Sequence, residues 1–512
     1  FGRGDLALPL QTLHVHLWQW LTQLGVGEIV QLKIARVAMW LCQVGTVSAI
    51  YVLARTFFNR CESLFAVLVY LSTAFVLIHG TSFRTDPLAG MFVIWSLVIF
   101  LRSPLTIGWM MLFAIFSTLS GMITVKVGLY LPAFIAVAIW RIVTALSARQ
   151  EIMRVIITVL LTLMVFAIVF LLHKSTLSTV ESSAAGSMLS SAWNARFLSF
   201  SGMFPVWTGS LYGVVLSPLP YFCLMFGMVI MIISMIKKTE ISRYSWLLLG
   251  LATPLLSFLF YKNAYPYFLA FILSSAMLLA SAMFHHYRTR SMFQFFIIIA
   301  LIVSLLLTFS KRFYLQEHLE SQRNMQSEIH KIFPDNTSYF DMGAGVPNYK
   351  NVGFFMTNWG QSKYHQKGGP IFSGILSEEI VPLLILNSPV LEHAVGVNDD
   401  FSYAQLFRED QEVLRGNYIP HWGKVWVAGK QIEVDQKPKT FDILIPGAYT
   451  VESNYPVNID GENYVNGDVV MFKRKEYRVS SKNSQDLTLR WGNHLYRPKA
   501  KSSDKPFFIE FE

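Results

Sequence analysis

The stretch HGTSFRTDPLAGMF, residues 79–92, joins two apolar segments and places charged side chains where they meet. ESLFAVLVYLSTAFVLI (62–78) precedes it, and MFVIWSLVIFL (91–101) continues from it. Both segments are apolar enough to lie in lipid, where about twenty such residues cross a bilayer. Charged residues beside lipid are costly and usually functional. Arg84 and Asp86 therefore mark this turn as a candidate site between two membrane helices.

The composition of the whole chain also indicates a membrane protein. Of 512 residues, 53% are hydrophobic and 14% charged, against about 25% charged in soluble domains. Residues 1–310 hold 19 Lys and Arg but 7 Asp and Glu, whereas residues 311–512 hold the remaining 23 and 25. The second part is nearly neutral, which argues against nucleic acid as a partner. A basic membrane part suits anionic membrane lipids or an anionic substrate.

Hydrophobic segments predict ten membrane spans. They lie at 34–57, 62–80, 87–102, 106–123, 125–145, 153–173, 216–236, 245–261, 265–285 and 291–310. One set of the connections between them is dense in basic residues: Arg55, Arg60, Arg102, Arg141, Arg149, Arg154, Lys237, Lys238, Arg243, Arg288 and Arg290. The positive-inside rule places that set in the cytoplasm. We therefore expect residues 1–33 and 311–512 outside, in the periplasm if the membrane is a bacterial inner membrane.

These boundaries divide the chain into three predicted parts. Residues 1–33 form an external segment, in which Leu10, Leu13, Leu17, Leu21 and Leu24 share one face of an amphipathic interfacial helix anchored by Trp18 and Trp20. Residues 34–310 form the polytopic α-helical membrane domain. Residues 311–512 form an external domain, with a small α/β unit followed from about residue 420 by alternating strands with Gly and Asn turns.

Asp86 has two interpretations. It precedes Pro87, a residue favoured at the start of a helix, so it can cap that helix or pair with Arg84. Alternatively, it is a carboxylate at the membrane surface that faces a charged substrate and steers a metal, a sugar hydroxyl or a proton. We predict the second role, with Arg84 positioning Asp86.

Three further cations lie at the predicted outer ends of spans. Lys126, in MITVKVGLYLP, and Lys262, in FYKNAYPYF, either extend along lipid to reach water or bind a phosphate. Arg36, in LKIARVAMW, enters a span from outside, where Asp86 and Glu28 are candidate partners for it. We predict that these three cations bind a phosphate.

The aromatic and histidine side chains near these cations complete the predicted pocket. An aromatic belt at the interface explains Tyr265 and Tyr267, but together with His79 they are also expected to line a substrate pocket. A divalent metal is compatible with Asp86, although His14 and His16 are two residues apart and no metal-ligand motif occurs. No nucleotide-binding motif is present, so the sequence predicts chemistry on a lipid-borne or external substrate.

The order of these features resembles the GT-C superfamily of polytopic glycosyltransferases. An external amphipathic helix is followed by QLKIARVAMWL, SFRTDPL, TVKVGLYLPA, YKNAYPYF and a large C-terminal domain. The nearest branch is similar to bacterial family 39, which is related to protein O-mannosyltransferases and to the transferase that adds aminoarabinose to lipid A.

The resemblance implies a sugar donor on polyprenyl phosphate and catalysis at the outer membrane face. The acceptor would be a lipid, a glycan or a protein. Asp86 and Lys126 match an acidic and a basic position of the family, whose principal carboxylate follows the first span. GRGDLALP does not match that motif, so we expect this carboxylate and a further span upstream of Phe1. A single displacement would invert the anomeric configuration.

Two other classes of function compete with the enzyme. A flippase or transporter of a lipid-linked glycan would carry repeats and polar residues at the membrane midplane, whereas these charges gather at one surface and no repeat is visible. A structural assembly protein would tolerate substitution of Arg84, Asp86, Lys126 and Lys262.

The predicted topology can be tested with a reporter enzyme fused after Glu512. Because ten spans return the chain to its starting side, the reporter should lie outside the cytoplasm. A reporter enzyme that functions only outside the cytoplasm should therefore be active in this fusion, and one that functions only in the cytoplasm should be inactive. A reporter that is active only in the cytoplasm would contradict both the spans and the predicted location of the site.

Overall fold

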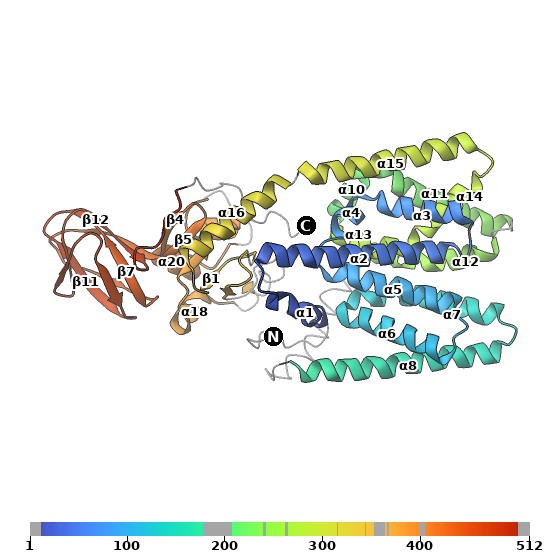
Figure 1. Ribbon diagram of the computed structural model, residues 1–512, viewed down its shortest axis with the longest axis horizontal. Helices are drawn as coiled ribbons and strands as arrows, with labels where there is room; N and C mark the ends of the chain where they lie inside the picture. The colour runs from blue at the N-terminus through green and yellow to red at the C-terminus, as the bar shows by residue number, and fades with distance from the viewer. Residues whose placement is uncertain are drawn as a thin grey trace. The chain divides into compact units, whose positions relative to one another are not determined.

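The structure is a computed structural model, and it describes residues 12–177, 207–238, 242–261, 265–314, 316–343, 345–352, 364–365, 368–398 and 405–499. The chain divides into two compact units, Phe1–Tyr314 and Leu315–Phe511. The first is a bundle of helices, here called the membrane unit, and the second is an α/β and β-rich C-terminal unit (Figure 1).

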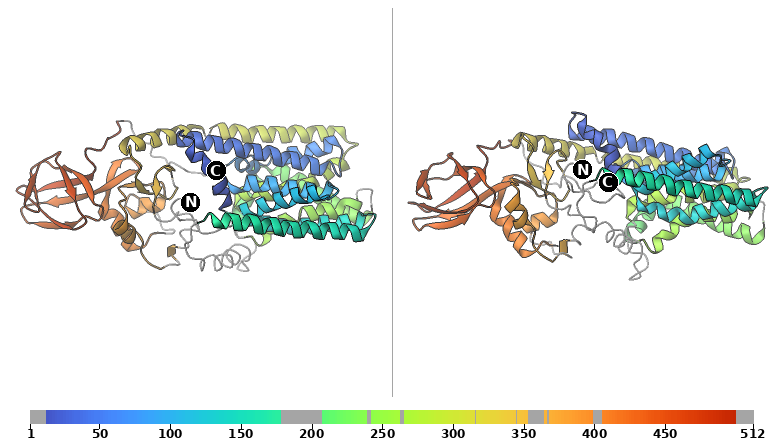
Figure 2. Two further views of the ribbon diagram at one scale, coloured as in Figure 1. Left: turned by 60° about the horizontal axis from the view of Figure 1, so that its bottom comes forward. Right: turned by 90° about the horizontal axis from the view of Figure 1, so that it is seen from below.

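Helices account for all the regular structure described in the membrane unit. They are α1 (Leu13–Trp18), η1 (Gln19–Gln23), α2 (Glu28–Ala54), α3 (Arg60–Leu71), α4 (Ala74–His79), α5 (Thr85–Arg102), α6 (Ile107–Ile123), η2 (Val125–Tyr130), α7 (Leu131–Thr144), α8 (Ala148–Ser175), α10 (Trp207–Leu216), α11 (Pro218–Lys237), α12 (Ser242–Leu251), η3 (Thr253–Leu259), α13 (Pro266–Ala276), α14 (Leu278–His286) and α15 (Ser291–Tyr314). Both views of Figure 2 show α8 as a long, straight helix, and the left view shows it along the edge of this bundle.

Helices lie in all ten predicted spans, but several spans are broken. Within the described residues, six helices are long and apolar enough to cross a membrane, and the pair α13 and α14, bent by 53°, makes a seventh. The predicted span 62–80 is divided into α3 and α4, and the span 245–261 into α12 and η3. α6 is apolar but, with 17 residues, is shorter than the helices of this set. Helices thus occupy every predicted span, and the crossing of the membrane by all ten stays a prediction.

Side chains that compete for backbone hydrogen bonds mark the break between α3 and α4. The Ser72 hydroxyl donates to the carbonyl oxygens of Leu68 and Leu301, and the Thr73 hydroxyl donates to that of Val69. Such bonds offer the chain an alternative to the helical pattern. Proline marks the break in the span 245–261, because Pro254 stands in the first turn of η3, where the missing N–H is not needed.

The N-terminal segment departs from the predicted amphipathic helix. The helix α1 ends at Trp18 and continues as the tighter turn η1. Leu13 and Leu21 are buried as predicted, but Leu17 is exposed, and the polar His14 is buried instead. A change of helix type shifts the face on which each later residue lies, so a single leucine stripe is not maintained.

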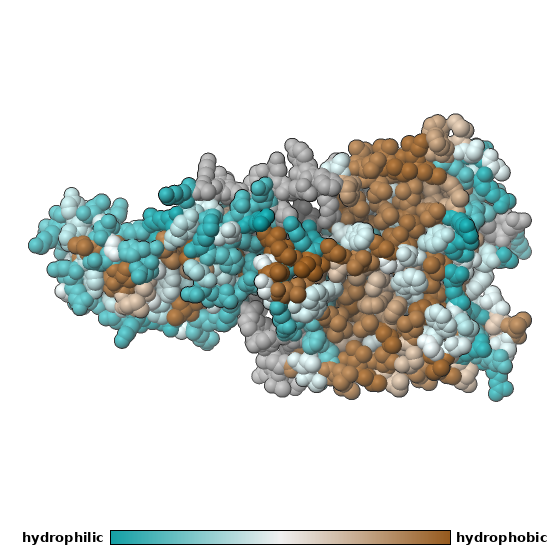
Figure 3. Space-filling view, viewed as in Figure 1, coloured by the Kyte–Doolittle hydropathy of each residue, from teal (hydrophilic) through white to brown (hydrophobic). Residues whose placement is uncertain are grey.

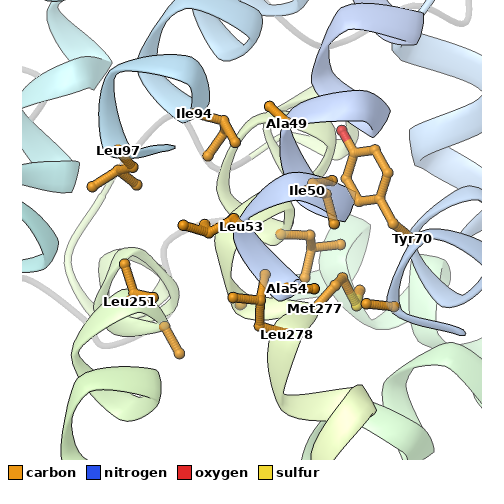
Figure 4. Packing of buried hydrophobic residues seen from close by; sticks show 14 of the residues in the cluster. Ala49, Ile50, Leu53, Ala54, Tyr70, Ile94, Leu97, Leu251, Met277 and Leu278 are labelled. Atoms are coloured by element: carbon orange, nitrogen blue, oxygen red, sulfur yellow. The ribbon is translucent and has the colours of Figure 1, made fainter. Parts of the chain in front are cut away.

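Apolar packing holds the membrane unit together around α2. Figure 4 shows side chains of α2 against those of neighbouring helices, with Ala49, Ile50, Leu53, Ala54, Tyr70, Ile94, Leu97, Leu251, Met277 and Leu278 labelled. The outer surface of the same unit is also apolar over much of the face seen in Figure 3. Helices that are apolar both inside and outside are typical of a protein that lies in lipid.

The C-terminal unit joins parallel and antiparallel strands in one sheet. Its helices are α16 (Gln316–Ile332), α18 (Phe372–Glu378), α19 (Pro389–Ala394) and α20 (Arg408–Asn417). Its strands are β1 (Ser338–Phe340), β2 (Lys350–Asn351), β3 (Leu383–Ile385), β4 (Tyr418–Trp422), β5 (Val425–Val434), β6 (Lys439–Asp442), β7 (Gly447–Glu452), β8 (Val457–Ile459), β9 (Glu462–Tyr464), β10 (Val469–Phe472), β11 (Glu476–Ser481) and β12 (Gln485–Trp491). The larger sheet has the order β10-β7-β12-β5-β3-β1-β2, with β4 paired to β5, and the smaller one β6-β11-β8-β9.

The change from α/β to β structure occurs where the sequence predicts it, near residue 420. β1 pairs in parallel with β2 and β3. On its other side β3 pairs antiparallel with β5, and the described pairs among the later strands are also antiparallel. The long strand β5 belongs to both parts, because it pairs with β3 at its start and with β12 along its later residues. Alternating side chains from the two sheets, including Val451, Val479 and Leu487, form a common core.

Close helix packing in the membrane unit gives a prediction about stability. A methyl group added at Gly227 of α11 would lie 1.9 Å from the carbonyl oxygen of Leu279, whereas one added at Gly121 of α6 would lie 3.7 Å from Phe166. Overpacking of this kind costs about 1–3 kcal/mol, so Gly227→Ala should lower the unfolding temperature in detergent. Gly121→Ala is the matched control and should not lower it. Equal unfolding temperatures for the two variants would contradict this account of the packing.

Candidate functional site

The turn between α4 and α5 places the opening motif at the start of a helix. α5 begins at Thr85, so Asp86 lies within the first helical turn rather than at the cap, and Arg84 precedes it with extended backbone angles. A carboxylate in the first turn is favoured by the helix dipole. The turn also passes close to α2, because a methyl group added at Gly80 would lie 2.7 Å from Oε1 of Gln43. Glycine thus allows this turn to pack against the bundle.

Asp86 forms a buried ion pair with Lys126. The Lys126 Nζ lies 2.6 Å from the Asp86 Oδ1, and the two side chains are 11% and 4% exposed. Lys126 belongs to η2, where its backbone N–H donates to the Thr124 hydroxyl. A lysine that extends along lipid to water would leave its ammonium group exposed. Lys126 is instead held inside the bundle by a carboxylate.

The predicted pairing of Arg84 with Asp86 is not found among the described residues. The guanidinium of Arg84 lies over the Tyr267 ring, 3.7 Å from its centroid. Residues two apart at a helix start point in different directions, which separates Arg84 from Asp86. The Lys126 ammonium group lies 4.8 Å from the centroid of the same ring. Both cations therefore gather at one tyrosine, in the geometry of cation–π contacts.

Tyr267 also brings the other predicted pocket residues into contact. The Tyr265 ring stacks on it at a centroid distance of 5.8 Å, and the His79 ring meets it edge-on at 6.3 Å. His79 ends α4, whereas Tyr267 is in the first turn of α13. The predicted site residues that meet here come from α4, α5, η2, α13 and the residues just before α5 and α13. They are His79, Arg84, Asp86, Lys126, Tyr265 and Tyr267. We call Arg84, Asp86, Lys126 and Tyr267 the charged cluster.

Two predicted phosphate-binding residues are not placed in the charged cluster. Lys262 lies outside the described residues. Arg36 lies on an exposed face of α2, and its pairing with Asp86 is not found among the described residues. Asp86 has Lys126 as its partner, which leaves no role for Arg36 in holding it.

His14 is a neighbour of the charged cluster that the sequence did not identify as a site residue. Its ring packs on Phe83 at a centroid distance of 5.3 Å, and the Trp18 ring packs on Phe83 at 5.7 Å. Burial lowers the pKa of the His14 imidazole to about 4, although the charge of Asp86 acts in the opposite direction. The sequence pattern LHVHLW gave no signal for this contact, because a regular amphipathic helix would leave His14 off its apolar stripe.

The chemical capacity of the charged cluster follows from its charges. Two cations and one carboxylate leave an excess of one positive charge beside aromatic rings. Arginine and lysine bind phosphate oxygens with charge-assisted hydrogen bonds, so the cluster suits an anionic group. The described residues contain no group of three metal-ligating side chains.

Comparisons with known proteins identify the fold of the chain. No family model and no curated protein matches the sequence. The crystal structure of ArnT from Cupriavidus metallidurans bound to undecaprenyl phosphate is similar, with a TM-score of 0.50 and 13% identity, over 76% of this chain and 85% of that chain. An oligosaccharyltransferase of Archaeoglobus fulgidus tethered to an acceptor peptide matches with a TM-score of 0.43 and 10% identity, over 81% of this chain and 64% of that chain. The likeness to ArnT shows that the membrane protein described above shares the fold of that structure.

The ion pair leads to a prediction about stability. Asp86→Asn keeps the shape of the side chain but leaves the Lys126 ammonium buried without its carboxylate, and breaking such a pair typically costs about 3–5 kcal/mol. The double variant Asp86→Asn/Lys126→Met removes both charges. We expect the single variant to unfold at a lower temperature in detergent than the double variant.

The matching single variant Lys126→Met completes the double-mutant cycle. Non-additive changes in unfolding temperature would confirm that the two side chains interact. Additive changes would mean that Asp86 and Lys126 contribute independently, contrary to the geometry.

Proposed function

We propose that this protein is an integral membrane glycosyltransferase that moves a sugar from a polyprenyl-phosphate donor to a lipid, glycan or protein acceptor. The observation that carries the proposal is the charged cluster, in which Arg84 and Lys126 meet over Tyr267 beside Asp86. In such a donor the phosphate is the leaving group, and its charge must be neutralised as the sugar departs. Preorganised cations next to a low-dielectric interior perform that task well.

The residues of the charged cluster and their neighbours are proposed to have different tasks in this reaction. Arg84 has no carboxylate partner among the described residues, so its guanidinium is available to bind a phosphate oxygen. Lys126 is held by Asp86 and can share its protons with a second oxygen of the phosphate. Tyr265 and His79, which contact Tyr267, are proposed to line the wall beside the sugar.

The fold and the membrane helices support the choice of donor. The similar structure of ArnT is bound to undecaprenyl phosphate, which is a polyprenyl phosphate. The present chain has the same fold and an excess of positive charge in its bundle. We further propose that it acts on a hexosyl or pentosyl donor as a member of bacterial family 39. Its site and C-terminal unit would face the periplasm from the inner membrane, and Lys262 would also contact the phosphate.

Binding of a polyprenyl phosphate without any sugar tests the proposal directly. We expect purified protein in detergent to bind a short-chain polyprenyl phosphate, as measured by microscale thermophoresis. Hydrogen bonds to charged groups contribute about 1.5–3 kcal/mol, so Arg84→Gln and Lys126→Met should each weaken binding by about tenfold or more. Lys33→Met is the matched control, because Lys33 is an exposed lysine of α2.

Transfer itself should be measured with donors that carry mannose, glucose or aminoarabinose on the same lipid phosphate. Release of sugar from at least one donor, reduced in both cluster variants, would support a glycosyltransferase. Equal affinity of the wild type, both variants and Lys33→Met for the polyprenyl phosphate would show that the cluster is not the phosphate site.

A further inference from the structure

Three segments of the membrane unit carry a large excess of positive charge where one helix follows another. Residues 55–60 connect α2 to α3, residues 237–243 connect α11 to α12, and residues 287–290 connect α14 to α15. Together they hold seven Lys and Arg and one carboxylate, Glu240, which lies outside the described residues. Such a concentration of one sign of charge attracts ligands of the opposite sign.

The helix α5 shows at which end of the bundle these segments lie. Asp86 of the charged cluster is in its first turn, and Arg102 is its last residue. The Arg102 guanidinium donates a hydrogen bond of 3.1 Å to the carbonyl oxygen of Val52, in the last turn of α2. With 18 residues and a rise of about 1.5 Å per residue, α5 separates its two ends by about 27 Å. The connection that follows α2 is therefore at the end of the bundle away from the charged cluster.

Contacts between rings bring the three connections together. The Phe57 ring meets the Tyr244 ring, at the start of α12, at a centroid distance of 5.4 Å. The neighbouring Phe58 ring contacts the His285 ring, at the end of α14, at 6.3 Å. Nδ1 of His285 lies 2.7 Å from Oε1 of Glu62, in the first turn of α3. The connection between α2 and α3 thus contacts the helix ends beside both of the other connections.

Four arginines on these segments are exposed, and we call them the basic patch. They are Arg60, Arg243, Arg288 and Arg290. None of the four forms an ion pair with a described residue, since the Glu62 carboxylate is held by His285. The guanidinium of Arg243 lies over the Tyr244 ring, 4.4 Å from its centroid, and that of Arg290 lies 5.9 Å from the centroid of Tyr287. Their charges are therefore available to an external anion.

Two other arginines at the same end of the bundle are used within the protein. Arg141 donates to the carbonyl oxygen of Phe100 near the end of α5, and its Nε lies 2.6 Å from Oε1 of Glu151. Nη1 of Arg154 lies 3.1 Å from Oε2 of the same carboxylate. The positive-inside rule predicts cations at one end of a membrane protein, but it does not predict which of them are paired. The basic patch differs from this second group because its arginines lack a described carboxylate.

Exposed apolar side chains border the basic patch on the helices that carry it. Leu64 lies one turn after Arg60 on the same face of α3. Met292 and Phe295 follow Arg290 in the first two turns of α15 and are also exposed, and α15 packs against α3. Figure 3 shows hydrophilic residues at this end of the membrane unit beside the apolar surface of its helices. Cations at the end of an apolar face match a lipid with an anionic head group.

We propose that the basic patch binds the phosphate of an anionic phospholipid in the membrane leaflet at this end of the bundle. Guanidinium groups present paired N–H donors that fit the oxygens of a phosphate. The acyl chains lie along the exposed apolar side chains of α3 and α15. This site is separate from the charged cluster and does not depend on the proposed transfer of a sugar. A lipid held by several arginines bridges the three connections and so stabilises the membrane unit.

Native mass spectrometry of the full-length protein in detergent tests the proposal, with phosphatidylglycerol as the anionic probe and phosphatidylcholine as the probe without net charge. The wild type should bind phosphatidylglycerol at least about fivefold more tightly than phosphatidylcholine, since each basic residue near a membrane surface contributes about that factor. Substitution of one patch arginine should therefore weaken binding of phosphatidylglycerol by about fivefold. The variants are Arg60→Gln, Arg243→Gln and Arg288→Gln.

Two control variants separate the basic patch from the rest of the charge. Arg149→Gln removes an exposed arginine of α8 that lies outside the patch, and Arg84→Gln removes a cation of the charged cluster. Both should bind phosphatidylglycerol as tightly as the wild type. Because a ligand that binds the folded state stabilises it, phosphatidylglycerol should also raise the unfolding temperature of both controls more than that of the patch variants.

Any of three results would overturn the inference. The first is equal affinity of the wild type for the two phospholipids. The second is a loss of phosphatidylglycerol binding in Arg149→Gln or Arg84→Gln as large as that in the patch variants, which would indicate a response to overall charge or binding at the charged cluster. The third is displacement of phosphatidylglycerol by millimolar inorganic phosphate, which would assign the basic patch to a soluble anion.

Discussion

A buried ion pair in an apolar bundle is the constraint on which the rest of the membrane unit depends. Transfer of a carboxylate and an ammonium group out of water costs several kcal/mol for each ion, and only good geometry offsets that cost. The pair of Asp86 and Lys126 meets the requirement through two rigid positions, the first turn of α5 and the turn η2. The surrounding helices must therefore hold these two turns in register. A break of α3 before the motif and the close approach at Gly80 serve that placement.

Much of the fold could be predicted from the sequence because lipid imposes a simple rule. Every spanning segment must be apolar and satisfy its own backbone hydrogen bonds, so hydrophobic runs located the helices. The breaks were less visible, since Ser72 and Thr73 interrupt a span through particular hydrogen bonds that composition does not reveal. The N-terminal helix was predicted only in part. Its leucine spacing assumes one helix type, whereas the chain changes to a tighter turn at Trp18.

The candidate site was predictable as a set of residues but not as a set of contacts. Asp86, Arg84 and Lys126 were identified because charge is rare beside lipid. Their pairing depends on the direction of each side chain in three dimensions, and Arg84 lies on Tyr267 rather than beside Asp86. Arg36 had the same sequence signal as Lys126 yet lies on an exposed face of α2. His14 had no signal at all, since only the folding of α1 onto Phe83 buries it.

In the proposed reaction, the same ion pair would also limit how tightly the site holds its product. A site with two unopposed buried cations would bind a phosphate strongly and release it slowly. Here Asp86 holds Lys126, so a phosphate bound as proposed would gain the full attraction of Arg84 but only a share of that of Lys126. When the product leaves, Lys126 returns to a partner already in place, and no buried charge remains unpaired at that position. An internal carboxylate of this kind would weaken the binding of the anionic product enough for release, as the proposed transferase with a charged lipid as leaving group requires.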